Sequence, residues 1–189
     1  MKRTISHIGF LLLTMQLLVV LLPTNSIAQD KESYIKAILI YKFIPFIKWP
    51  DNGFIYEDSK KNICTIGKSD VGKLLDVIAK KEGNQNYIIS KEIKLEYISK
   101  CDVLYIADIS KFIDIKNTEE NILKQIVVAS KINNILTVSD LDCFVKKGGM
   151  IGFVNKNEKI KFEINVLAVN EAMLSIEAIL LELAVKIYR

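Results

Sequence analysis

The chain has 189 residues, of which 50% are hydrophobic and 25% are charged, and its formal net charge is +4. This length and apolar content suit one hydrophobic core, and the small, scattered positive charge excludes a dedicated nucleic-acid-binding protein. The chain holds a single histidine, His7, so most zinc sites and most histidine-based acid–base chemistry are excluded elsewhere in the sequence.

Residues 1–28 are predicted to be a secretory signal peptide. Two basic residues open it, an apolar stretch of about 15 residues follows, and residues 26–28 (Ser-Ile-Ala) form a small-x-small cleavage motif. The alternative is a retained membrane anchor, but the apolar stretch is shorter than the roughly 20 residues that span a bilayer. We therefore expect cleavage between Ala28 and Gln29, export, and one mature domain over residues 29–189. Because the leader carries two basic residues and no acidic one, the mature net charge is +2.

Residues 31–49 form the first predicted element of the mature chain, a helix that Pro45 should kink or end. Its few lysines fall at different helical angles, so nearly every side of the helix is apolar. Such a helix is either buried on most sides or meets a partner, and both interpretations stay open. Aromatic side chains are favoured anchors at protein interfaces. The candidates for a partner or dimer surface are Tyr34, Ile38, Tyr41, Phe43, Phe46 and Trp49.

Beyond residue 60, short apolar runs alternate with stretches of helical periodicity. The predicted strands cover residues 62–67, 86–93, 102–107, 135–138, 150–154 and 159–164, and the predicted helices cover 71–79, the stretch after Thr118, and 166–188 as one helix or two. Strands that alternate with helices imply right-handed βαβ crossovers. The expected fold is a three-layer α/β sandwich of flavodoxin-like or Rossmann-like type. Its mostly parallel sheet should end in an antiparallel C-terminal hairpin, followed by a terminal helix.

No motif supports catalysis, a cofactor or a metal ion. Residues 67–74 approach a phosphate-binding loop, but Leu74 stands where that loop needs Ser or Thr to hold magnesium. No serine lies in a G-x-S-x-G motif. Aspartates near strand ends can ligate metals, but without histidine we favour caps and turns for them. They are Asp102, Asp108, Asp140 and Asp142. We therefore expect no enzyme activity, no cofactor and no metal site.

The cysteines are Cys64, Cys101 and Cys143. Cys64 lies near the beginning of the first predicted strand and Cys101 immediately precedes the third. In a flavodoxin-like order these two strands are neighbours about 4.8 Å apart, which is within reach of a disulfide. An exported protein can form that bond. The alternative is two buried free thiols, and in either case Cys143 is expected to be unpaired.

Several segments occur along the chain in a specific order. They are residues 34–50, 63–67, 101–106, 135–140, 148–153 and 161–165, followed by a leucine-rich terminal segment. This ordered series, which covers essentially the whole mature chain, resembles the YfiR-like family of bacterial periplasmic regulatory proteins.

The resemblance implies a regulator rather than an enzyme. The best-understood type of member represses a membrane-bound diguanylate cyclase, the enzyme type that makes cyclic-di-GMP, by binding its periplasmic domain. An outer-membrane lipoprotein sequesters that member in turn, and redox state tunes its fold. The family's paired cysteines map onto Cys64 and Cys101. The alternative function is a periplasmic small-molecule receptor, which would need an enclosed pocket between two lobes; a domain of this length is small for two lobes.

Overall fold

The computed structural model describes residues 25–50, 60–83, 86–114 and 117–189. The chain divides into two compact units, residues 1–31 and 32–189, and the fold described below is that of the second. Most of the predicted signal peptide lies outside the described residues. The backbone at Ala28 and Gln29 is helical and belongs to α2, so the cleavage site stays a prediction. Within the described ranges, no helix combines the length and the apolar character needed to cross a membrane.

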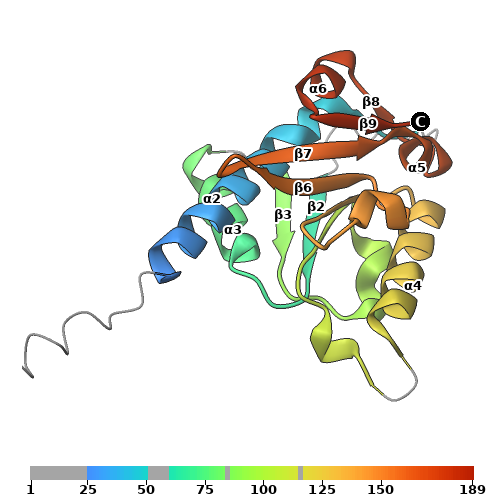
Figure 1. The fold of residues 1–189 in the computed structure, drawn as a ribbon, viewed down its shortest axis with the longest axis horizontal. Coiled ribbons are helices and arrows are strands. Elements are labelled where there is room, and N and C mark those ends of the chain that lie inside the picture. The colour runs from blue at the N-terminus through green and yellow to red at the C-terminus, as the bar shows by residue number, and fades with distance from the viewer. Residues whose placement is uncertain (1–24, 51–59, 84–85, 115–116) are drawn as a thin grey trace, which may run out of the picture. The chain divides into compact units, whose positions relative to one another are not determined.

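The fold centres on a seven-stranded sheet with the strand order β3-β2-β4-β5-β6-β7-β9 (Figure 1). The strands of this sheet are β2 (Lys61–Ile66), β3 (Tyr87–Ser90), β4 (Val103–Ile106), β5 (Leu136–Ser139), β6 (Ile151–Lys156), β7 (Lys159–Asn165) and β9 (Lys186–Tyr188). All neighbouring strands run parallel except β6 and β7, which form the predicted antiparallel hairpin. Counted along the chain, the first five strands have the flavodoxin-like order 2-1-3-4-5.

Helices cover both faces of this sheet and produce three layers (Figure 1). The helices are α2 (Asn25–Phe43), α3 (Val71–Lys81), α4 (Glu119–Ile132), α5 (Val166–Glu171) and α6 (Ala178–Leu183), with 3₁₀ helices η2 (Ile44–Phe46), η3 (Leu95–Lys100), η4 (Ser110–Phe112) and η5 (Phe144–Lys147). Ile40 of α2 and Leu75 of α3 share one core cluster with Val103. Ile126 of α4 shares a second cluster with Leu104. The three-layer α/β prediction is confirmed.

The two core clusters arise from the alternation of side chains along each strand. In β4, Val103 and Tyr105 face the cluster of α2 and α3, whereas Leu104 and Ile106 face the cluster of α4. Because all four side chains are buried, this strand is apolar on both faces, as central strands of parallel sheets are. That explains why it occurs in the sequence as a continuous apolar run rather than an alternating one.

The first predicted helix ends earlier than residue 49. Helix α2 stops at Phe43, and Pro45 lies in the first positions of η2, where its missing N–H costs no hydrogen bond. Ile47 and Lys48 then form the short strand β1 (Ile47–Lys48), which pairs with β8 (Ser175–Ile176). The predicted break at Pro45 is therefore confirmed, and the continuation of the helix beyond it is wrong.

The terminal segment differs from the long helix or helices predicted over residues 166–188. It contains two six-residue helices, α5 and α6, separated by β8 and followed by β9. Met173, with φ of 54°, lies just after α5 in the left-handed region, which no helix can continue. Antiparallel pairing of β8 with β1 and parallel pairing of β9 with β7 then hold the chain extended. Tertiary pairing thus overrides the apolar periodicity of this segment.

Candidate functional site

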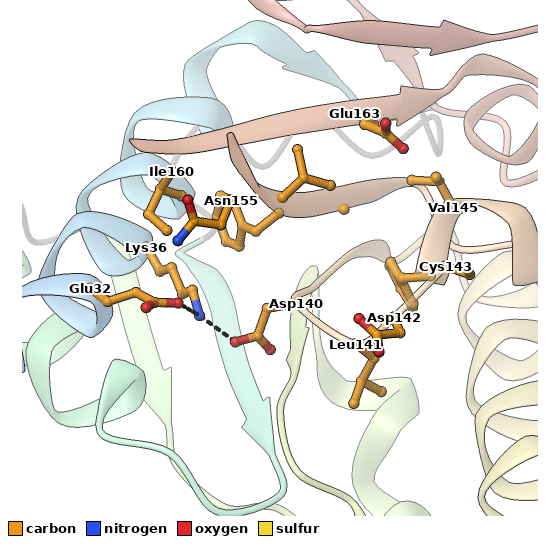
Figure 2. Close-up of a pocket in the computed structure, with 14 residues that line it drawn as sticks. Glu32, Lys36, Asp140, Leu141, Asp142, Cys143, Val145, Asn155, Ile160 and Glu163 are labelled. Atoms are coloured by element: carbon orange, nitrogen blue, oxygen red, sulfur yellow. Dashed lines mark hydrogen bonds and ion pairs between the residues drawn. The ribbon is translucent and has the colours of Figure 1, made fainter. Parts of the chain in front are cut away.

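A cavity of about 380 Å³ lies beyond the carboxyl end of β5, beside the β6–β7 hairpin. Figure 2 shows Glu32 and Lys36 of α2 on one side, Asp142 in the loop after β5 on the other, and Glu163 on β7. Its lining is completed by apolar side chains that include Phe153, Val154 and Ile160. Carboxyl ends of parallel strands are the usual ligand sites of α/β sheets. We call this space the Lys36 cavity.

Lys36 is the buried charge of this cavity, because only 10% of its side chain is exposed. Its ammonium lies 2.6 Å from Glu32 Oε1, one helical turn earlier, and it also donates to Asp140 Oδ2. Burial alone would lower the pKa of Lys36, but the hydrogen bonds and charges of Asp140 and Glu32 outweigh it and raise that pKa. The lysine is therefore held charged between two carboxylates, and it ties α2 to the end of β5.

Tyr105 is a buried residue near Asp140 in the core. Tyr105 is 1% exposed, and Asp140 and Ser69, which precedes α3, are the polar residues that influence its hydroxyl. Burial, followed by the nearby charge of Asp140, raises the pKa of Tyr105 far above its ordinary value, so the phenol stays neutral. This polar cluster draws on four segments, because Lys36 belongs to α2, Asp140 follows β5, Tyr105 lies in β4 and Ser69 precedes α3. Of these groups, Lys36 and Asp140 form the ion pair that joins α2 to the end of β5.

The position where flavodoxin-like folds bind cofactors, between the ends of β2 and β4, is closed by backbone. Lys68 N–H donates to the carbonyl of Asp108 at 3.1 Å. Gly67 has φ of +87°, and a Cβ there would lie 2.3 Å from that same carbonyl oxygen. Glycine is needed at position 67 for this close approach of two chain segments, not for a phosphate. In the described part of the chain, no group of His, Cys, Asp and Glu is arranged to hold a metal ion.

The structure joins Cys64 and Cys101 by a disulfide, with their Cα atoms 5.8 Å apart. Cys64 lies in β2 and pairs in register with Leu104 of β4, three residues beyond Cys101. Both cysteines are buried in the cluster under α4. The pairing predicted from neighbouring strands is therefore present. Cys143 is exposed and unpaired, in the left-handed conformation before η5, and it lines the Lys36 cavity.

The aromatic segment predicted as a partner surface is divided by the structure. Tyr41 and Phe43 are core residues, because Tyr41 meets the Tyr87 ring edge-on at 5.2 Å and the Phe43 ring lies 4.8 Å from that of Phe162. Tyr34 is 40% exposed. The remaining members are partly buried against the core; they are Ile38, Phe46 and Trp49. A partner surface on this segment stays a prediction and can involve only the members that are exposed or partly buried.

The Lys36 cluster cannot be identified from the sequence. In the sequence, Lys36 is one of several lysines that interrupt an apolar helix, and Asp140 is one of several strand-end aspartates. One signal was available, because Glu32 and Lys36 are four residues apart on a predicted helix, which is the spacing of a helical ion pair. Nothing in the sequence places Asp140 or Tyr105 beside them, since that depends on how β4 and β5 pair.

The chain is similar to one protein family and to proteins of known structure. The model of a family described as YfiR/HmsC-like matches residues 33–185. A conserved domain protein from Vibrio cholerae has a similar fold, with a TM-score of 0.53 and 15% identity over 82% of this chain. An ABC domain from Streptococcus pneumoniae, solved in complex with L-Trp, has a TM-score of 0.50 at 15% identity over 82% of this chain. The chain spans 60% of the length of each. No curated protein matches it.

Proposed function

The chain belongs to the YfiR/HmsC-like family, and on this premise we propose that it is a periplasmic regulator of an inner-membrane diguanylate cyclase. It acts by protein–protein contact and catalyses no reaction itself. The observation that carries this proposal is the extent of the family match, residues 33–185, which covers nearly all of the second compact unit. Export by the predicted leader would bring the protein to the compartment into which the sensor domain of such a cyclase projects.

We infer that helix α6 supplies part of the surface that binds the cyclase. Ile179 and Leu183 lie one turn apart on the same side of this helix and are 53% and 64% exposed. Leu180 anchors the helix in the core, because this side chain is only 2% exposed. Exposed aliphatic side chains on a well-anchored helix can be buried by a partner without a large cost in side-chain ordering.

The partly buried end of the predicted aromatic segment contacts the residue that precedes this helix. The N–H of Glu177, just before α6, donates to the Phe46 carbonyl at 2.9 Å, and its carboxylate lies 3.4 Å from Lys48 Nζ. The partly buried Phe46 and Trp49 are therefore close to the start of α6. We propose that α6 and these aromatic residues form one binding surface, which we call the α6 surface.

Redox control and further partners are also proposals. The Cys64–Cys101 disulfide joins β2 to the segment that begins β4, so reduction would loosen the centre of the sheet and with it any surface the sheet supports. An outer-membrane lipoprotein that sequesters the regulator is proposed from the family alone. A homodimer could form through α4, where Val128 and Ile132 are 48% and 74% exposed.

Site-specific photo-crosslinking in intact cells tests the α6 surface. A photoreactive residue at position 183 should capture an inner-membrane protein that carries a diguanylate cyclase domain, identified by mass spectrometry. The matched control is position 77, since Val77 is 56% exposed on helix α3, which is not part of the proposed surface. Capture of the same protein from both positions, or capture of no cyclase from position 183, would contradict the proposed surface.

A second candidate function is a small-molecule receptor, and the Lys36 cavity is the observation that favours it. Its volume lies within the range of small-molecule sites. Regulation of a cyclase and binding of a small ligand are compatible, because a ligand that stabilises one conformation of a regulator changes the fraction available to its partner.

A further inference from the structure

We propose that the Lys36 cavity binds a small organic cation, namely an alkylammonium or guanidinium compound with a short apolar chain. The inference goes beyond regulation of a cyclase and does not depend on which protein the chain binds. The cavity has a volume of about 380 Å³, enough for a molecule of several non-hydrogen atoms. Its charges and its shape both point to this class of ligand.

The charges that line the cavity do not balance. Four carboxylates face one ammonium group; they belong to Glu32, Asp140, Asp142 and Glu163, and the ammonium to Lys36. Lys36 pairs with Glu32 and Asp140. Among the described residues, Glu163 accepts a hydrogen bond only from the hydroxyl of Tyr188, at 3.0 Å. Asp142 has no hydrogen bond or ion pair with any residue that the structure describes. Two carboxylates that line the cavity therefore form no ion pair within the described ranges.

The shape of the cavity keeps one of these carboxylates accessible. Gly152 of β6 lies directly opposite Glu163 of β7 in the antiparallel register, and it also lines the cavity. Because glycine has no side chain, nothing from β6 covers Glu163 at this point. On the other side of β7, Lys186 of β9 lies opposite Glu163 in the parallel register. Asp142 is exposed in the loop after β5. A cation that enters the cavity can thus approach these two carboxylates, which Figure 2 shows on β7 and in the loop after β5.

The remaining lining explains why the ligand should carry an apolar chain. Val154 and Ile160 contribute aliphatic surface, and Phe153 contributes an aromatic ring. Methylene groups gain free energy when they leave water for such a surface, whereas a bare metal ion gains nothing from it. Anionic ligands are disfavoured, because the only ammonium of the described lining is already held by two carboxylates and the net charge is negative.

Isothermal titration calorimetry on the purified protein tests this inference. The probes are cadaverine and agmatine, with 1,5-pentanediol as the uncharged compound of matched length. We expect saturable binding of at least one cation, and binding of the diol weaker by about tenfold or more, the size of effect that a lost charge-assisted hydrogen bond produces. Asp142→Asn and Glu163→Gln should each weaken cation binding by a similar factor. Glu182→Gln removes an exposed carboxylate of α6 that does not line the cavity and should leave binding unchanged.

Three results would overturn the inference: no saturable binding of either cation, equal binding of the diol, or no difference between the two cavity variants and Glu182→Gln. Thermal unfolding of each variant shows whether it is folded. Asp142→Asn changes an exposed residue and Glu163→Gln keeps an acceptor for the Tyr188 hydroxyl, so both should fold. Because the titration contains no cyclase, failure here would leave the proposed regulatory function standing.

Discussion

At the residue scale, Lys36 shows how one buried charge can organise a surface. Its side chain is 10% exposed, whereas Glu32 and Asp140 keep 43% and 31% of theirs exposed. The lysine thus loses most of its hydration. Its ion pairs with two carboxylates that stay partly exposed to water compensate for that loss. Removing one member of such a cluster leaves the others without compensation, which is usually costlier than the net worth of the pair.

Lys36→Met should therefore reduce the free energy of unfolding by about 1–3 kcal/mol, the range found when a hydrogen-bonded charged group loses its partner. Urea denaturation of the purified protein measures this change. Lys73→Met is the control, because the Lys73–Asp70 pair lies in the open with 71% and 55% of the two side chains exposed, and it should have no measurable effect. Equal effects of the two substitutions would contradict the structural role given to Lys36.

Lys36 should also make the stability of the protein depend on pH in the alkaline range. Because the folded-state pKa of Lys36 is raised above its ordinary 10.5, its contribution to stability is complete below that pH and is lost as the pH rises through the folded-state value. The stability difference between the protein and Lys36→Met should therefore be larger at about pH 8 than at about pH 12. A Cys143→Ser background prevents thiol–disulfide exchange during the measurement. A stability difference that grows with pH would contradict the raised pKa of Lys36.

At the element scale, the disulfide joins two neighbouring strands of the sheet. Cys64 and Cys101 close a loop with a sequence separation of 37, and the chain-entropy account gives such a loop a stabilisation of about 4 kcal/mol. The double variant Cys64→Ser/Cys101→Ser should lose most of that stability, and dithiothreitol should lower the thermal midpoint of the unmodified protein in the same direction. Three reactive thiols in the denatured, non-reduced protein would instead show that the bond does not form.

Helix α6 offers two adjacent aliphatic residues with opposite roles. Leu180 is 2% exposed and belongs to the core cluster, whereas Ile179 is 53% exposed. Leu180→Ala should cost about 2–5 kcal/mol, because it leaves a cavity. Ile179→Ala should change stability by less than about 0.5 kcal/mol. Chemical denaturation of both variants tests the placement of this helix, and comparable losses would show that the helix is turned differently.

The sequence is informative at this scale wherever short-range pattern decides the structure. The strands around Cys64, Leu104 and Thr137 are apparent as apolar runs, and Thr118 caps α4 as expected by accepting from the Asn121 N–H at 3.2 Å. The terminal segment could not be predicted in that way, because β8 and β9 are extended only through their pairing with β1 and β7. The Lys36 cavity could not be predicted for the same reason, since Asp140 and Glu163 are far from α2 in sequence.

At the scale of the whole molecule, the Lys36 cavity and the α6 surface lie on different elements of the fold. The Lys36 cavity lies at the end of β5 beside the hairpin, and the α6 surface rests on the segment that follows β8. Ile179→Asp/Leu183→Asp should abolish binding to the cyclase without unfolding the protein, because both side chains are exposed. Val77→Asp, at an equally exposed site on α3, should retain binding in the same co-purification. Loss of binding in the Val77 variant alone would contradict the α6 surface and indicate that the interface lies on α3.

The most direct test of the account is the cellular concentration of cyclic-di-GMP, measured by mass spectrometry in a strain that lacks this protein. If the protein restrains a diguanylate cyclase from the periplasm, the concentration should rise in the deletion strain. Expression of the full chain should return it to the original level, whereas a version starting at residue 29 without the leader should not. An unchanged concentration in the deletion strain, or full restoration by the leaderless version, would contradict the claim that this is an exported cyclase regulator.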